Sequence, residues 1–307
     1  MPERALVTGS HGFIGANFVP KLVARGMKVR AFDNFSRGSR EHLAGTDVEV
    51  VEADVRDREA VARAVAGMDV VVHLAAFGSV AESVEDPFEN FDVNVLGTLV
   101  LLEACASAGV GKVVFASTGG AIMGNTPPPV DETSVPWPIS PYGASKLCGE
   151  AYCHAFAGSF GLPVVGLRFA NVYGPISAHK KGAVTAFVTR ALRGQPLVIY
   201  GDGTATRDFL FVDDLCEGIC AATDAPLEDE VIHLASGEET SIGALAGLVL
   251  ELVGADVPIH YEERRRGEIE RTFARPARAA ELLGFRPAHS LREGMRKTVE
   301  WFAAREG

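Results

Sequence analysis

The sequence predicts a doubly wound α/β protein, with a parallel sheet in its first half and a smaller C-terminal lobe. Apolar, strand-like runs alternate with helical patterns in the first half, and a glycine-rich turn directly follows the first run. This alternation weakens after about residue 170. A chain of 307 residues is long enough for one full domain and a second, smaller unit.

The expected strands are short runs rich in apolar and β-branched residues. They are Ala5 to Thr8, Lys28 to Phe32, Val48 to Ala53, Val70 to Leu74, Val113 to Ser117 and Pro163 to Arg168. Between them, apolar residues recur at helical spacing, which predicts right-handed crossover helices. These helices are Gly15 to Arg25, Arg58 to Ala66, Val93 to Ala108 and Tyr142 to Phe160.

The stretch from Gly124 to Pro141 contains six prolines and is expected to form an ordered loop, since proline is excluded from helix interiors and central strands. We expect residues 1–170 to form the first domain, with residues 208–236 returning to it. The smaller lobe should then comprise residues 171–207 and 237–307, and end in a helix from Leu291 to Ala304.

Composition limits the possible partners and compartment. A net charge of -11 argues against a nucleic-acid or anionic-membrane partner. No apolar run looks long enough to span a bilayer, and a strand begins within a few residues of Met1, before any signal peptide would fit. The five cysteines lack CxxC spacing and the eight histidines are scattered. We therefore expect a cytoplasmic protein with reduced cysteines and no metal site.

The first motif is the run Gly9-Ser10-His11-Gly12-Phe13-Ile14-Gly15, which lies between a strand and a helix. Glycine there permits a tight turn and lets backbone N–H groups approach a pyrophosphate at the helix N-terminus. The next strand ends at Asp33, where a carboxylate can accept hydrogen bonds from an adenosine ribose and repel a 2′-phosphate. Together they favour NAD over NADP, although Arg37 lies nearby.

The second motif, Tyr142-Gly143-Ala144-Ser145-Lys146, places a phenol and an ammonium one helical turn apart. A nearby cation lowers the pKa of a tyrosine, so we expect Tyr142 to act as a base near neutral pH. The pair follows the proline-rich loop and a strand that ends in hydroxyls, Ser117-Thr118.

These motifs together resemble the extended short-chain dehydrogenase/reductases, over nearly the whole chain. Asp54-Val55, the runs 73–76 and 94–98 and the run 168–175 are similar to further stretches of that family. In the second lobe, Gly201-Asp202-Gly203 and Arg207-Asp208-Phe209 resemble the nucleotide-diphosphate-sugar epimerases.

The resemblance implies a Rossmann-type domain that binds NAD and a lobe that binds a UDP-sugar. The implied cofactor residues are Gly9, Gly12, Phe13, Ile14, Gly15, Asp33, Asn34, Ser36, Arg37, Gly38, Asp54, Val55, Leu74, Ala75, Ala76, Asn94, Tyr142 and Lys146. The implied substrate residues are Ser79, Thr118, Gly119 and Tyr142 around the sugar, Asn171, Arg207 and Arg265 at the diphosphate, and Ala186, Phe187, Val188, Ile199, Tyr200 and Glu268 around the uridine.

The chain departs from the family pattern after the fifth strand. Gly119 occupies the position where the family often has its catalytic hydroxyl, and Met123 stands where tyrosine is usual. The hydroxyl role must therefore fall to Thr118 or Ser117, and we favour Thr118.

The implied reaction inverts C4 of the sugar through a 4-keto intermediate. Tyr142 would take the proton of the 4-hydroxyl while hydride moves to the nicotinamide; Lys146 would assist Tyr142 and bind the nicotinamide ribose. A 4,6-dehydratase is less favoured, because such enzymes typically carry Asp-Glu where this chain has Gly119-Gly120. A non-catalytic NAD-sensing protein should have lost Tyr142 or Lys146.

The sugar and the oligomeric state are also expectations. The run from Ser177 to Gly182 includes His179, Lys180 and Lys181, which could attract a carboxylate at C6. We therefore expect UDP-glucuronate as substrate, with UDP-glucose as the alternative. The segment from Val93 to Ala104 is apolar around much of its circumference and, with the Tyr142 to Phe160 helix, is expected to form a homodimer interface.

Overall fold

The computed structural model describes residues 2–264 and 269–306. A seven-stranded parallel sheet has the order β11-β6-β5-β4-β1-β2-β3. Its strands are β1 (Arg4–Thr8), β2 (Lys28–Asp33), β3 (Glu49–Glu52), β4 (Val70–His73), β5 (Lys112–Thr118), β6 (Val164–Phe169) and β11 (Asp229–Leu234). The doubly wound prediction is confirmed, and the six predicted strands lie within one residue of their expected ends. The seventh, β11, comes from the segment expected to return to the first domain.

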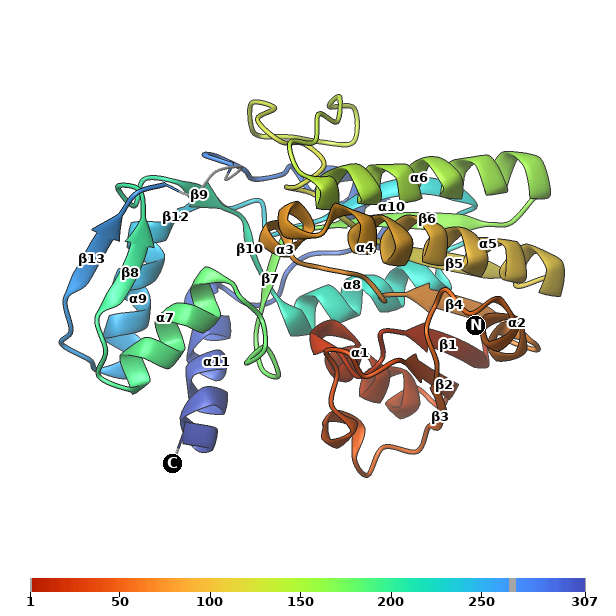
Figure 1. Ribbon diagram of the computed structural model, residues 1–307, viewed down its shortest axis with the longest axis horizontal. Coiled ribbons are helices and arrows are strands. Elements are labelled where there is room, and N and C mark those ends of the chain that lie inside the picture. Colours follow the sequence, from red (N-terminus) through yellow and green to blue (C-terminus); the bar gives the residue numbers. More distant parts are fainter. Residues whose placement is uncertain (1, 265–268, 307) are drawn as a thin grey trace.

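Helices cover both faces of this sheet (Figure 1). They are α1 (Phe13–Ala24), α2 (Arg58–Val65), α3 (Val80–Glu85), α4 (Pro87–Phe91), the π-helical turn η2 (Asp92–Leu96), α5 (Gly97–Ala108), α6 (Pro141–Phe160) and α8 (Val212–Asp224), with a short 3₁₀ turn η1 (Arg40–Leu43). Alternate residues of β1 face the two layers: Val7 packs in the core that includes residues of α1 and α8, whereas Leu6 packs with residues of α2, α5 and α6.

A second group of elements lies beside the sheet (Figure 1). It comprises β7 (Asn171–Tyr173), α7 (Ala183–Leu192), β8 (Leu197–Tyr200), β9 (Thr206–Arg207), β10 (Phe209–Phe211), β12 (Thr240–Ser241), α9 (Ile242–Val253), β13 (Ile259–Glu262) and α11 (Leu291–Glu306). The remaining helix, α10 (Ala277–Leu283), packs instead against β11 and α8 (Figure 1). The strands of the second group form pairs: β7 with β10 and β8 with β13 are parallel, and β9 with β12 is antiparallel. One hydrophobic cluster runs from Val7 in the sheet to Phe302 in α11, so the two groups share a continuous core.

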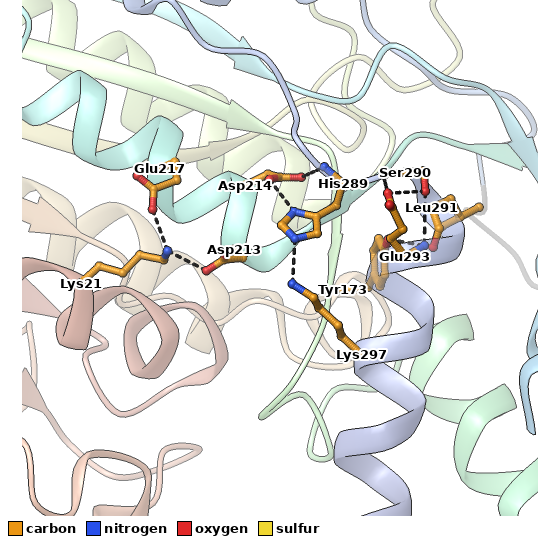
Figure 2. Close-up of polar contacts among 10 residues, drawn as sticks. All are labelled: Lys21, Tyr173, Asp213, Asp214, Glu217, His289, Ser290, Leu291, Glu293 and Lys297. Atoms are coloured by element: carbon orange, nitrogen blue, oxygen red, sulfur yellow. Dashed lines mark hydrogen bonds and ion pairs between the residues drawn. The ribbon is translucent and has the colours of Figure 1, made fainter.

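Polar contacts connect α11 to the helices under the sheet, as Figure 2 shows. The buried carboxylate of Asp214 in α8 accepts hydrogen bonds from the backbone N–H of His289 (3.1 Å) and from its Nδ1 (2.8 Å). Lys297 of α11 donates to the other ring nitrogen of His289 (2.9 Å). Tyr173 donates to the carbonyl of Leu291 (3.2 Å), which ties β7 to the start of α11.

The helix before β5 is longer than expected. It begins at Pro87 rather than Val93 and continues through η2 to Ala108, a span of 22 residues that contains an 18-residue stretch of mean hydropathy 1.5. By length and composition it could cross a membrane, so the expectation that no run is long enough is not upheld. A core helix of a soluble protein can have the same length and composition, and this helix packs against α2 and α6.

The proline-rich segment forms the loop that was expected, and it positions the start of α6. Val130 anchors the loop by donating to the carbonyl of Phe273 (3.0 Å) and accepting from Arg275 (2.8 Å). At its end, Ser140 caps α6 by accepting a hydrogen bond from the N–H of Gly143 (3.2 Å). Only glycine fits at 143, because a Cβ there would lie 2.2 Å from the carbonyl oxygen of Ala121.

Candidate active site

The glycine-rich turn joins β1 to α1 at the carboxyl edge of the sheet. Gly9 has a left-handed backbone (φ 66°), and a Cβ there would lie 2.7 Å from the backbone nitrogen of Ala75. A Cβ at Gly15 would lie 2.3 Å from the carbonyl oxygen of Gly9. Gly12, the N-cap of α1, offers no side-chain cap, and the first turn contains no acidic residue. The helix N-terminus is thus arranged to receive an anion such as a pyrophosphate.

Asp33 lies at the end of β2 and is buried. Its two oxygens accept hydrogen bonds from the backbone N–H groups of His11 and Phe35, each at 2.8 Å. Asp33 therefore holds the glycine-rich turn against the loop after β2, in addition to any contact with a ribose. Each carboxylate oxygen keeps further acceptor capacity.

The other predicted adenosine residues surround this loop. Asn34 accepts hydrogen bonds from the N–H (3.0 Å) and hydroxyl (2.7 Å) of Ser36 and donates to Asp54 (3.0 Å). The Arg56 guanidinium hydrogen-bonds to Asp54 and lowers the pKa of that carboxyl to about 2. The remaining residues make close packing contacts: Gly38 lies against His11, and Val55 against Gly97.

A chain of buried hydrogen bonds connects the end of β1, next to the glycine-rich turn, to η2. His73 bonds to the hydroxyl of Thr8 (2.7 Å) through Nδ1 and to that of Thr98 (3.1 Å) through Nε2. Thr98 donates to the carbonyl of Asn94 (2.6 Å), so the network assigns the proton of the neutral imidazole to Nε2. Burial, together with the charge of Lys146, lowers the pKa of His73 to about 3.

Asn94, a predicted cofactor residue, is buried in η2 and holds the loop after β4. Its side chain accepts from the N–H of Phe77 (2.8 Å) and donates to the hydroxyl of Ser145 (3.0 Å) in α6. A π-helical turn commonly marks a functional site, and here it aims Asn94 between the two segments. The segment Leu74, Ala75 and Ala76, which it supports, is half-buried along the same edge.

Tyr142 and Thr118 come together at the carboxyl end of β5. The Thr118 side chain approaches the Tyr142 phenol, and its hydroxyl accepts from the N–H of Ala121 (3.4 Å). Burial raises the pKa of Tyr142 to about 12, and the interaction with Thr118 acts in the opposite direction. The expected lowering of the tyrosine pKa by Lys146 is not seen: loss of solvent around the phenol dominates, and the group that lowers this pKa is Thr118.

Lys146 is buried one turn further along α6. Its ammonium donates to the carbonyl of Ala116 (2.8 Å) and lies 5.0 Å from the ring centroid of Phe115. Burial lowers the pKa of Lys146 to about 8, an effect opposed by the nearby side chains of Cys153 and Glu150. The lysine thus fixes α6 on β5 beneath the tyrosine.

Ser117 has different partners from Thr118. It donates to Glu150 of α6 (2.5 Å), whose carboxylate also accepts two hydrogen bonds from Arg168 of β6 (2.8 and 3.0 Å). All three side chains are buried. Sequence reasoning missed this ion pair, although an arginine inside the apolar strand β6 indicates a buried carboxylate partner.

Gly119 leaves little space for the usual hydroxyl. A Cβ there would lie 3.0 Å from the Nδ1 atom of His233, and Met123 is fully buried. With Ser117 bonded to Glu150, Thr118 is the hydroxyl of this strand end that reaches Tyr142.

Two of the predicted diphosphate residues, Asn171 and Arg207, lie on β7 and β9. The N–H of Asn171 donates to the carbonyl of Asp208 (2.8 Å), next to Arg207. The buried Asp208 carboxylate accepts from Ser236 (2.7 and 2.8 Å) and from the N–H of Gly237 (3.0 Å), which fixes the backbone beside Arg207. Arg265 and Glu268 lie outside the described residues.

Several side chains expected to frame the uridine instead belong to the core. Phe187, Val188 and Ile199 are buried, because the apolar face of α7 packs on α9 and β8. These three residues could contact a base only through their backbone atoms. Ala186 is exposed and Tyr200 is half-buried. Ser79 caps α3 by accepting from the N–H of Glu82 (3.3 Å), so its hydroxyl is partly engaged.

The basic loop does not present three cations to one pocket. Lys180 is exposed overall, but its ammonium is engaged: it donates to the carbonyl of Val172 (2.6 Å) and lies 5.3 Å from the ring centroid of Phe13. Lys181 pairs with Glu82 (2.8 Å), and burial lowers the pKa of His179. The electrostatic argument for a hexuronate therefore loses its basis.

Comparisons with known proteins agree with this geometry. Residues 5–238 match the model of the NAD dependent epimerase/dehydratase family. The chain belongs to this family. Its fold matches a UDP-glucose 4-epimerase with UDP-glucose from Thermotoga maritima, with TM-score 0.96, 38% identity and coverage of 99% of this chain and 100% of that one.

Two other family members extend the comparison. A UDP-glucose 4-epimerase of Thermus thermophilus in complex with NAD has TM-score 0.92 and 40% identity, over 97% of this chain and 98% of that one. A UDP-glucuronate 4-epimerase of Thermodesulfobacterium geofontis is 31% identical over 96% of this chain and 95% of its own.

NAD, the cofactor of the family, fits the residues present at the sheet edge. The close approaches at Gly9 and Gly15 form a backbone cradle that side chains would fill, and the uncapped start of α1 opens onto it. Asp33 lies at the end of the neighbouring strand, where an acidic residue meets the adenosine ribose in this type of fold.

Proposed function

We propose that this protein is a UDP-sugar 4-epimerase that interconverts the C4 epimers of UDP-glucose. Membership of the family and the similarity to solved epimerases support an NAD-dependent nucleotide-sugar epimerase. The observation that carries the proposal is the approach of Thr118 to the phenol of Tyr142 at the end of β5, with Lys146 buried one helical turn away.

In the proposed mechanism, Thr118 binds the 4-oxygen of the sugar while the Tyr142 phenolate accepts the 4-hydroxyl proton. Bound NAD supplies a hydride acceptor that later returns the hydride, so the reaction has no net redox change. A phenol with a pKa near 12 is mostly protonated at neutral pH, so ionisation of Tyr142 requires cationic groups close to it when the reactants are bound. Lys146 is placed to be one of them. Tyr142 then returns the proton to the opposite epimer.

Dehydration fits the site less well. A 4,6-dehydratase needs an acid and a base beside the catalytic hydroxyl to eliminate water. Gly119 and Gly120 follow Thr118 here, and the Cβ of an acidic residue at 119 would already lie 3.0 Å from the buried His233.

The contacts of the basic loop favour a neutral hexose over a hexuronate. Lys180 and Lys181 are held by Val172 and Glu82, so neither is free to meet a carboxylate at C6. Asn171 and Arg207, next to the fixed Asp208, are our proposed diphosphate contacts. Relatives of both substrate types exist, so a direct comparison of the two sugars is required.

The test is to incubate the purified protein with UDP-glucose, UDP-glucuronate and their N-acetylated analogues, and to identify products by NMR. We expect conversion of UDP-glucose to UDP-galactose with a higher kcat/KM than for UDP-glucuronate, and no 4-keto-6-deoxy product. A preference for UDP-glucuronate that Lys181→Ala removes would contradict the proposed sugar.

A further inference from the structure

Three charged side chains from separate segments meet beside the adenosine end of the cofactor site. Glu82 of α3 receives the guanidinium of Arg37 on one oxygen and the ammonium of Lys181 (2.8 Å) on the other. The Glu82 side chain is 17% exposed, whereas those of Arg37 and Lys181 are 42% and 74% exposed. The carboxylate is therefore the most enclosed member of the cluster.

Arg37 follows Asp33 by four residues, in the loop after β2. In dinucleotide-binding folds an acidic residue at this strand end favours the ribose 2′-hydroxyl of NAD, whereas a nearby arginine accommodates the 2′-phosphate of NADP. This chain has both. In the structure, however, the Arg37 guanidinium bonds to Glu82 and lies 5.2 Å from the ring centroid of Phe77.

We propose that Glu82 is a specificity-determining residue that keeps the enzyme selective for NAD by engaging Arg37 and Lys181. A 2′-phosphate carries up to two negative charges, and Glu82 opposes it in two ways. The carboxylate repels the phosphate, and it occupies the two cations that would otherwise neutralise it. Asp33 supplies the direct contribution to specificity, and Glu82 the indirect one.

The test measures which dinucleotide the protein retains, rather than its activity. Holoenzyme is exchanged against mixtures of NADP and isotopically labelled NAD and freed of unbound nucleotide. The protein is then denatured, and the released dinucleotides are quantified by mass spectrometry. We expect Glu82→Gln, which removes the charge at nearly constant volume, to raise the retained NADP:NAD ratio about fivefold to tenfold.

Two variants control this measurement. Glu251→Gln removes a carboxylate from an exposed arginine pair between α9 and α11, and should leave the ratio unchanged. Adding Arg37→Ala to Glu82→Gln should reverse most of the gain. A ratio in Glu82→Gln equal to that of Glu251→Gln, or a gain that persists in full without Arg37, would overturn the proposal.

A further variant tests the proposal with Glu82 intact. Because Arg37 is already held by Glu82, Arg37→Ala alone should change the NADP:NAD ratio by less than about twofold. A large loss of NADP binding in that variant would show that Arg37 is free to bind phosphate, and the proposal would be wrong.

Discussion

Ser117 and Thr118 are consecutive residues of β5, yet their hydroxyls have different partners. Ser117 donates to the buried Glu150, whereas Thr118 approaches the phenol of Tyr142 and lowers its pKa. Successive strand side chains point to opposite faces, so one hydroxyl secures α6 to the sheet while its neighbour faces the proposed reaction centre.

Thr118→Val and Ser117→Ala should therefore have different effects. We predict that Thr118→Val lowers kcat about 10- to 100-fold with little change in stability, because it removes a hydrogen-bond donor to the 4-oxygen. Ser117→Ala should lower the free energy of unfolding by about 1–2 kcal/mol, because a buried carboxylate loses a donor, and should change kcat less. Steady-state kinetics and urea denaturation of both variants would check this, and the reverse ranking of kcat would move the role to Ser117.

Tyr142→Phe should lower kcat by about 10²- to 10⁴-fold, because it removes the proton acceptor and almost no volume. The bound NAD content and the melting temperature should stay close to those of the parent protein. Product formation is followed by NMR and the cofactor by absorbance after denaturation. Turnover at the parent rate would exclude Tyr142 as the base.

Glu150→Gln should destabilise the protein by about 3–5 kcal/mol, because it leaves the Arg168 guanidinium buried without a counter-charge. Glu300→Gln is the matched control: it breaks an exposed pair with Arg296 in α11 and should cost about 0–1 kcal/mol. Equal costs in urea denaturation would show that Glu150 and Arg168 are not held as a buried pair.

The sequence predicted six of the seven strands of the parallel sheet to within one residue, because most of these strands are buried on both faces and are punctuated by glycine and proline. The roles of Tyr142, Lys146 and Thr118, whose spacing on α6 and β5 is local, stay predictions. The sequence could not show that Phe187 and Val188 face the core, or that Glu82 binds Arg37 and Lys181. Those contacts join segments up to about a hundred residues apart, and their geometry depends on packing that no local pattern encodes.

The buried, neutral state of His73 should make the free energy of unfolding depend on pH. Its pKa is about 3 in the folded protein, well below the ordinary value of 6.5, so between these values the unfolded chain binds a proton that the folded chain does not. Stability is therefore lost as pH falls below 6.5, by about 1.4 kcal/mol per unit. The free energy of unfolding of the parent should fall by about 2 kcal/mol more than that of His73→Gln between pH 6.5 and 5. Parallel pH profiles from urea titrations would contradict a buried neutral histidine.

The last prediction concerns assembly. Of the apolar residues that suggested a dimer helix, Val95, Val100, Leu101 and Leu102 are buried within the chain itself. Leu96 of the same segment is exposed, and further exposed apolar residues lie on the adjoining helices α4 and α6 (Figure 1). These residues are Phe88 and Phe91 of α4, and Tyr152 and Phe160 of α6.

Apolar side chains gathered on adjacent helices mark an association surface, and a closed dimer would bury them against their own copies. We predict a homodimer by light scattering, and its dissociation on combining Phe88→Asp with Leu96→Glu. Tyr261→Asp, at an exposed aromatic residue of β13, is the control and should leave the mass unchanged. A monomer mass for the parent protein at every concentration, or a dimer that survives the double substitution, would place the interface elsewhere or exclude it.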